Sequence, residues 1–198
     1  MGPHTIVTPF HDCQGKAVYV SQPLAASPVL NQTWALDFMT ETLYDGRRVR
    51  LLTVIDEGNR EGLEIAMGLS LPSRRVTRVL SDLTAVHGAP AALRVDNGPE
   101  FLAQSFIDWA AEHGAAIHYI QPGKPDQNAY IERFNRTYRT EVLNAHLCDS
   151  IAELRALTDT WLRIYNSERP HDSLGRKPPL EFLPRPSSIE ASTYAVST

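Results

Sequence analysis

The sequence predicts an α/β protein, a mixed five-stranded sheet flanked by helices. Three strand-like segments come first, and helix-like and strand-like segments then alternate along the chain. Hydrophobic residues make up 42% of the 198 residues and charged residues 21%, which are ordinary globular values. A chain of this length can bury one sizeable core, so we expect one compact domain.

The first three predicted strands form an antiparallel meander. Residues 34–40, 48–55 and 63–69 are rich in apolar residues and have strand-like lengths. Asp45 and Gly46 stand between the first two segments, and an Asp-Gly pair favours a tight turn because it tolerates positive φ.

Helices and strands alternate in the middle of the chain. Residues 73–87 carry Val76, Leu80 and Leu83 at helical spacing, and Gly88 suits the end of that helix. Residues 92–95 are predicted as a strand, 99–113 as a helix that begins with proline, and 116–120 as the fifth strand.

Two further helices are predicted after a loop at residues 121–126. They span residues 127–147 and 150–167, and the second begins with Ser150 and Glu153 at capping-box spacing. The proline-rich residues 169–186 are predicted to run over the surface. The chain is thus divided into an extended arm at 1–30, a core at 31–185 and a tail at 186–198.

Composition excludes several classes of protein. No stretch approaches 18 apolar residues and no basic segment precedes an apolar run at the N-terminus, so we expect a soluble cytoplasmic protein without a membrane span. Cys13 and Cys148 are too few for a disulfide framework or a cysteine zinc site. The net charge of −4 argues mildly against a self-sufficient nucleic-acid binder, because phosphate neutralisation dominates such binding.

Three acidic residues are candidates for chemistry. Asp37 lies within the first strand, Asp96 ends the fourth, and Glu132 lies on a helix with Arg136 and Arg139 within roughly 40° around its axis. Carboxylate oxygens at such positions suit Mg²⁺ or Mn²⁺. Taken singly, each has a structural alternative: an exposed strand residue, a turn residue, and an i,i+4 ion pair between Glu132 and Arg136.

The order of four sequence motifs is more specific than any of these residues alone. They are Trp-Ala-Leu-Asp-Phe at 34–38, Arg-Val-Asp-Asn-Gly-Pro-Glu-Phe at 94–101, Gly-Lys-Pro-Asp-Gln-Asn-Ala-Tyr-Ile-Glu-Arg-Phe-Asn-Arg at 123–136, and Tyr-Asn followed by Arg-Pro-His-Asp-Ser-Leu-Gly within 165–175. Asp96 and Glu132 are separated by 35 residues. This arrangement resembles the integrase core shared by retroviral integrases and many bacterial insertion-sequence transposases, over about residues 31–185.

The resemblance implies a ribonuclease H-like fold and a DDE transposase or integrase activity, the metal-dependent cleavage and transfer of DNA strands in transposition. It implies that Asp37, Asp96 and Glu132 are catalytic and hold two Mg²⁺ or Mn²⁺ ions. Residues expected to contact DNA are Lys124, Gln127, Asn128, Arg136 and Arg139. The expected partners are the element ends, the target DNA and further copies of the chain. The helix-turn-helix region expected upstream in a transposase of this kind is absent from this chain.

Two alternatives remain open at the level of sequence. One is a catalytically inactive ribonuclease H-like module that binds DNA or supports assembly. The other is a nuclease acting on RNA–DNA hybrids, because a shared fold does not determine the substrate.

Overall fold

The computed structural model describes residues 28–121 and 128–185. The strands are β1 (Thr33–Thr42), β2 (Arg48–Asp56), β3 (Gly62–Gly68), β4 (Ala92–Val95) and β5 (Ala116–Tyr119). The helices are α1 (Ser73–His87), α2 (Pro99–Leu102), α3 (Gln104–Glu112), α4 (Ala129–Tyr138), α5 (Ile151–Ser167) and α6 (Pro179–Phe182), with a π-helix η2 (Arg139–Leu143) and a 3₁₀-helix η3 (Asp172–Leu174).

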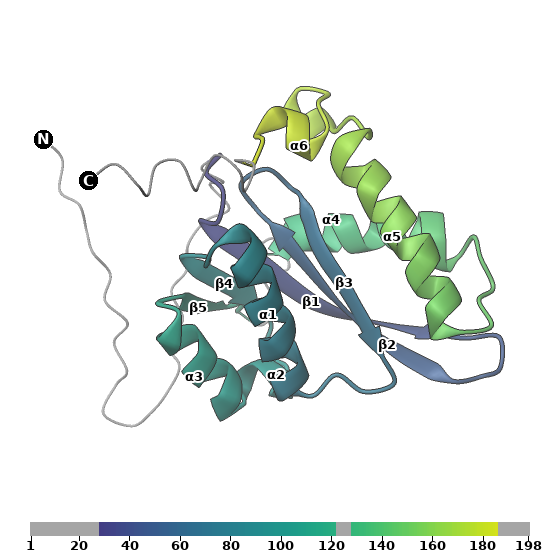
Figure 1. The fold of residues 1–198 in the computed structure, drawn as a ribbon, viewed down its shortest axis with the longest axis horizontal. Helices are drawn as coiled ribbons and strands as arrows, with labels where there is room; N and C mark the ends of the chain where they lie inside the picture. The colour runs from purple at the N-terminus through teal and green to yellow at the C-terminus, as the bar shows by residue number, and fades with distance from the viewer. Residues whose placement is uncertain (1–27, 122–127, 186–198) are drawn as a thin grey trace, which may run out of the picture.

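The strands form one mixed sheet in the order β3-β2-β1-β4-β5 (Figure 1). The first three strands pair antiparallel, while β4 pairs parallel to β1 and β5 parallel to β4. This arrangement confirms the predicted mixed five-stranded sheet. It also makes β1 the central strand, covered by neighbours on both edges.

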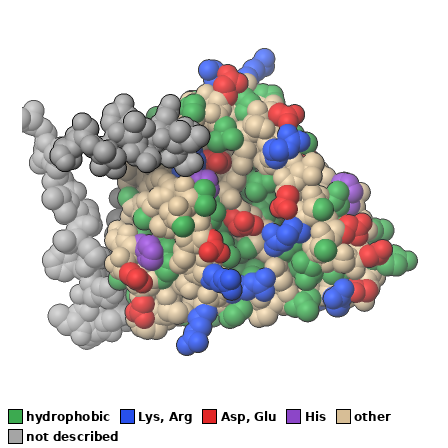
Figure 2. All heavy atoms as spheres, viewed as in Figure 1, with side chains coloured by type: hydrophobic (Ala, Val, Ile, Leu, Met, Phe, Trp, Pro, Cys, Tyr) green, Lys and Arg blue, Asp and Glu red, His purple; other side chains and the backbone are tan. Residues whose placement is uncertain are grey.

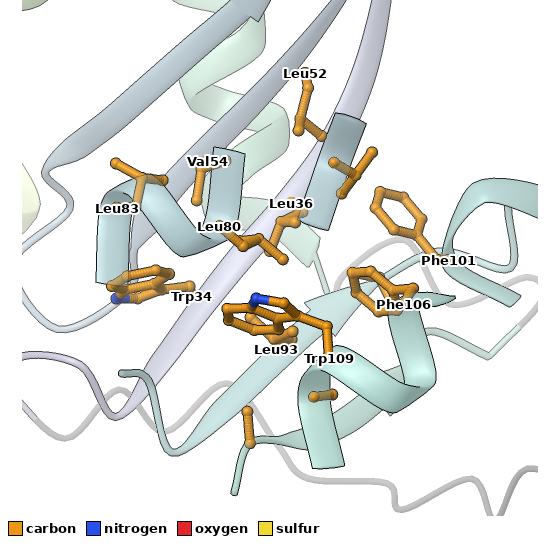
Figure 3. Close-up of a cluster of buried hydrophobic side chains, with 14 of the residues drawn as sticks. Trp34, Leu36, Leu52, Val54, Leu80, Leu83, Leu93, Phe101, Phe106 and Trp109 are labelled. Carbon is orange, nitrogen blue, oxygen red and sulfur yellow. The ribbon is translucent and has the colours of Figure 1, made fainter. Parts of the chain in front are cut away.

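Helices cover both faces of the sheet, and each face has its own hydrophobic cluster. On one face Trp34 and Leu36 of β1 pack with side chains from α1, α2 and α3, as Figure 3 shows. On the opposite face Ala35 and Met39 belong to a cluster that includes residues of α4 and α5. Because side chains alternate along β1, this strand contributes to the hydrophobic clusters on both faces of the sheet. The fold therefore has three layers, with the sheet between two layers of helices.

The predicted helix at 99–113 is wrong in one respect, because it is broken at Ala103. This residue is extended, with φ −67° and ψ 141°, and separates α2 from α3. In a continuous helix Phe101 and Phe106 would point about 140° apart. The break lets both rings reach the same core, where both are fully buried with centroids 5.3 Å apart.

The predicted helix at 127–147 also differs from the structure. Its α-helical part ends at Tyr138 and continues as the wider π-helix, in which the adjacent residues Val142 and Leu143 are both buried. The predicted start of α5 is confirmed. Ser150 Oγ accepts a hydrogen bond from the Glu153 N–H at 3.2 Å.

The segment after α5 is integrated into the fold rather than running over the surface. Leu174 and Pro179 are buried, and Arg185 donates to Asp56 and Glu61 at the turn between β2 and β3. Proline content suggested a surface loop, but proline at the start of α6 suits the first turn of a helix.

The same region explains the Tyr-Asn motif at 165–166. Asn166 on α5 accepts from the N–H of Gly62 at 2.9 Å and donates to its carbonyl at 2.8 Å. A Cβ at Gly62 would lie 2.7 Å from the Phe134 ring, so this close approach requires glycine. The motif therefore joins α5 to the start of β3.

Charged side chains of both signs are interspersed on the face shown in Figure 2, in keeping with the small net charge. Within residues 28–121 and 128–185, no helix combines the length and apolar character that crossing a bilayer requires.

Candidate active site

Asp37 lies in the middle of β1, on the face covered by α4. It shares this face with Ala35 and Met39 because side chains alternate along a strand. One carboxylate oxygen accepts a hydrogen bond from the Phe38 N–H at 2.8 Å, and the other accepts from Nδ2 of Asn135 on α4 at 2.8 Å. The carboxylate is therefore oriented by both its own strand and the helix above it.

Asp96 follows directly after β4, the parallel neighbour of β1. The register pairs Ala35 with Arg94, so Asp37 and Asp96 each lie two residues beyond a paired position on adjacent strands. Asp96 is exposed, and its Oδ1 accepts a hydrogen bond from the Gly98 N–H at 2.8 Å. The Asp-Asn-Gly turn is thus real, and it stands beside Asp37 at the carboxyl end of the parallel pair.

Glu132 lies in the first turn of α4 and lines the same open hollow as Asp37. The hollow has a volume of about 490 Å³, and its other lining residues are Phe38, Met39, Thr40, Asn135, Arg136 and Arg139. No ion pair joins Glu132 to Arg136 in the part of the chain that the structure describes. The i,i+4 ion pair that was the structural alternative for Glu132 is therefore not formed.

The three carboxylates share one electrostatic environment. Burial, joined by the charges of Asp96 and Glu132, raises the pKa of Asp37 to about 6, against the opposing hydrogen bonds from Phe38 and Asn135. Asp96 does not line the hollow, but its charge still acts on Asp37. A carboxylate that burial and neighbouring acids make costly to ionise, as Asp37 is, is typical of functional sites.

The two arginines of the hollow differ in their partners. Arg139 donates through Nη2 to the Thr40 carbonyl at 2.9 Å and lies 3.3 Å from a carboxylate oxygen of Glu41 through Nη1. Arg136 is exposed and forms no ion pair with any described residue. Arg136 is thus available to an incoming anion, whereas Arg139 is already engaged.

The remaining predicted DNA contacts come from the segment before α4. Lys124 and Gln127 lie outside the described residues. Asn128 is the residue before α4; it is 5% exposed, its Oδ1 has no hydrogen-bond donor, and it does not line the hollow. Its contact with DNA remains a prediction.

The sequence reasoning missed Asn135, which holds the Asp37 carboxylate, and Glu41, which pairs with Arg139. Asn135 stands three residues after Glu132, so helical spacing alone could have placed it on the same side of α4. Glu41 gave no such signal, because its partner is 98 residues away in the chain.

The acidic side chains do not form a ready metal cluster as they stand. Among residues 28–121 and 128–185, no three Asp, Glu, His or Cys side chains are gathered closely enough to hold an ion. The donor set nevertheless fits a hard cation, since Asp37, Asp96 and Glu132 offer only carboxylate oxygens.

Comparison with known proteins decides the family. Two family models, both described as "Integrase core domain", match residues 29–125 and 113–179. This chain belongs to the integrase core family. The matched residues include β1, β4 and α4, and so all three carboxylates of the site.

Relatives of this integrase core occur in bacterial insertion elements. The chain is 44% identical over 161 residues to an uncharacterized 39.2 kDa protein of insertion element IS476 from Xanthomonas euvesicatoria, covering 81% of this chain and 46% of that protein. It is 39% identical over 161 residues to an uncharacterized 31.7 kDa protein of IS407 from Burkholderia multivorans, covering 81% of this chain and 58% of that protein. The chain thus spans about half the length of these relatives.

The fold of this integrase core is that of retroviral integrase catalytic cores. The HTLV-2 integrase catalytic core domain, solved in complex with magnesium in a trimeric form, superposes with a TM-score of 0.64 at 18% identity. The match covers 79% of this chain and 98% of that one. The predicted ribonuclease H-like fold is confirmed.

Asp37→Asn is expected to change how the stability of this integrase core depends on pH. Because the pKa of Asp37 rises from 3.8 to about 6 on folding, the folded protein binds this proton more tightly. The contribution of the protonated Asp37 to the free energy of unfolding is complete below pH 4 and is lost as pH rises through 6. The metal-free Asn variant should therefore gain up to about 3 kcal/mol relative to the parent between pH 4 and pH 7.

Urea denaturation of both proteins in EDTA at pH 4.5 and pH 7 measures this difference. The matched control is Asp82→Asn, at an exposed position of α1. A parent-to-variant difference that is the same at both pH values would contradict the raised pKa.

Proposed function

We propose that this integrase core is the catalytic part of an insertion-sequence transposase, which cleaves DNA strands at the element ends and joins them to target DNA. The observation that carries the proposal is the Asp37 carboxylate. It lies on the central strand, faces an open hollow that Glu132 shares, and has a pKa raised by burial and by two neighbouring acids. The kinship with insertion-element proteins supports DNA as the substrate.

Asp37, Asp96 and Glu132 would hold two Mg²⁺ or Mn²⁺ ions. Asp37 is the central carboxylate of the three, because the charges of both Asp96 and Glu132 act on it. When bound, such ions would activate the attacking water or 3′-hydroxyl and stabilise the departing oxygen. The HTLV-2 catalytic core, which shares the fold, was solved with magnesium. Asn135 keeps the Asp37 carboxylate turned toward the hollow.

Arg136 and Arg139 line the hollow on the same helix as Glu132 and would bind the phosphates on either side of the reacting one. Their guanidinium groups supply charge-assisted hydrogen bonds to phosphate oxygens. The assembly that acts would contain several copies of the chain together with the two element ends and the target.

The test is a strand-joining reaction. A labelled duplex carrying the terminal sequence of the parent element is incubated with the protein and a supercoiled plasmid, in Mg²⁺, Mn²⁺ or EDTA, and the products are separated under denaturing conditions. The proposal expects metal-dependent nicking of the end and joining of its 3′ strand to the plasmid. DNA binding without nicking or joining would favour an inactive module, and cleavage confined to an RNA–DNA hybrid would favour a hybrid nuclease.

Glu41→Gln is expected to tighten DNA binding. Glu41 forms an ion pair with Arg139, so a DNA phosphate that binds Arg139 must displace Glu41. Ion pairs near the surface contribute about 0.2–1 kcal/mol to stability. The variant should therefore bind a non-specific duplex about two- to fivefold more tightly. Fluorescence anisotropy at low salt measures the change.

The gain should vanish when Arg139 is also replaced, so Glu41→Gln in an Arg139→Gln background should bind like Arg139→Gln alone. Glu168→Gln, which frees Arg163 on α5, is the matched control for removing one exposed acid. An equal gain from Glu168→Gln would mean that net charge, rather than competition for Arg139, determines the affinity.

A further inference from the structure

Arg60, in the turn between β2 and β3, adopts an unusual backbone conformation. Its φ is 65°, in the left-handed region that non-glycine residues seldom occupy. The conformation carries the side chain across to α4, where the guanidinium carbon lies 3.4 Å from the centre of the Tyr130 ring. Strain of this kind is found at functional sites more often than elsewhere.

The guanidinium group of Arg60 has hydrogen-bond donors for which the described part of the chain supplies no acceptor. Its Nε and Nη1 are buried without an acceptor. No hydrogen bond among the described residues joins Arg60 to the nearby carboxylates, and these are bonded to other arginines, Glu57 to Arg94 and Asp56 to Arg185. Buried donors without partners are rare in proteins, and a bound ion is one of the explanations for them.

A second arginine and a histidine lie near Tyr165, on which Arg60 also acts. Arg133 follows Tyr130 by one turn of α4; it is exposed and forms no ion pair with a described residue. The ring of His171 packs against the edge of Tyr165, with centroids 4.6 Å apart. Arg60 and Arg133 both act on the Tyr165 hydroxyl, opposing the rise in its pKa that burial causes.

The acids that act on Arg60 are each paired with another arginine, Glu57 with Arg94 and Asp56 with Arg185. The neighbouring Arg169 is neutralised by Glu141, and Asp172 is the acid that faces His171. Burial lowers the pKa of Arg60, which means that its positive charge is poorly solvated where it stands. A bound anion would satisfy both the unmatched donors and the charge.

We propose that Arg60, in the turn between β2 and β3, and Arg133, on α4, form a second phosphate-binding site, separate from the hollow, which holds one phosphate of the DNA strand undergoing reaction. The proposal rests on the proposed function for the identity of the strand. Arg133 is one residue beyond Glu132, about 100° around the helix, so a strand crossing the start of α4 can reach both the hollow and this site. A planar guanidinium group with free donors matches the geometry of a phosphate.

The experiment measures binding of a labelled DNA duplex over a range of salt concentrations by fluorescence anisotropy. The proteins are the parent, Arg60→Gln, Arg133→Gln, the double variant, and Arg78→Gln as control. Arg78 is an exposed arginine of α1 that forms no ion pair with a described residue, so it matches Arg133 in charge and exposure on the opposite face of the sheet.

Each single variant at the site is expected to bind about fivefold more weakly at low salt and to lower the slope of log affinity against log salt by about 0.9, the value for one phosphate. Since both arginines hold the same phosphate, the double variant should lose no more slope than either single variant. Arg78→Gln should leave the slope unchanged.

A second measurement separates strand phosphate from free phosphate. The melting temperatures of the parent and of Arg133→Gln are compared with and without inorganic phosphate at constant ionic strength. Stabilisation by phosphate that depends on Arg133, without any effect on DNA binding, would assign the site to a free anion and overturn the strand assignment. Arg133→Gln decides the matter if Arg60→Gln proves unstable, since Arg133 is exposed.

Failure of this inference and failure of the proposed function are distinguishable. If the parent binds DNA and both variants bind with the same affinity and salt slope as the parent, the proposed second site is wrong and the proposed function is unaffected. If the parent does not bind DNA and phosphate does not raise its melting temperature, both are wrong.

Discussion

Asp96→Asn or Glu132→Gln is expected to lower the rate of metal-dependent strand joining by at least about 10³-fold, or roughly 4 kcal/mol of transition-state stabilisation. An amide cannot supply the anionic oxygen that a hard cation needs, so either substitution removes one of the three carboxylates proposed to hold the metal. The rate of product formation at saturating DNA measures the loss. The control is again Asp82→Asn, which should retain the parent rate.

The same variants separate a catalytic role from a structural one through stability. Without metal, Asp96→Asn should be as stable as the parent or more stable, because it removes an acid that raises the pKa of Asp37. Metal that binds only the folded protein should stabilise the parent by about 1.4 kcal/mol at ten times its Kd, and the variant should lose most of this gain. Marked destabilisation of metal-free Asp96→Asn, with an undiminished response to metal, would identify Asp96 as a turn residue only.

Arg185→Met is expected to destabilise the fold by about 3–5 kcal/mol. Arg185 donates to Asp56 at 2.8 Å, to Glu61 at 2.5 Å and to Oδ1 of Asn31 at 2.9 Å. The Asp56 side chain is 0% exposed, so losing its cation leaves an uncompensated buried charge. The contact also joins the two ends of the described fold, since Asn31 precedes β1.

Urea denaturation at pH 7 measures this loss, and a fall of roughly 10 °C in melting temperature should accompany it. The comparison is Arg163→Met, because Arg163 and its partner Glu168 are 63% and 58% exposed. That variant should change stability by less than about 1 kcal/mol. Equal effects of the two substitutions would show that the Arg185 contacts contribute no more than a surface ion pair.

Much of the fold follows from local sequence pattern. The five strands were predicted within one or two residues of their positions, because each is a short apolar run bounded by turn residues. The breaks at Ala103 and after Tyr138 were not predicted, because local helix propensity continues through both. They arise from the packing of rings and aliphatic side chains that are distant in the sequence.

The role of Asp56 is another feature that local sequence pattern does not predict. Asp56 and Glu57 directly follow the second predicted strand, where an acidic residue is ordinary turn chemistry. In the structure both are buried, and their partners Arg185 and Arg94 lie 129 and 37 residues away. Ion pairs of this kind have no local signature, since they depend on which segments the fold brings together.

The candidate carboxylates and the family resemblance were accessible from the sequence alone, because the four motifs lie in fixed order and Asp96 and Glu132 keep their spacing of 35 residues. Only the tertiary structure showed that Asn135 holds Asp37, that Glu41 occupies Arg139, and that the donors of Arg60 are unmatched. The physical reason is that motifs record which residues are present. Desolvation, charge coupling and unsatisfied hydrogen bonds exist only after distant segments have packed together.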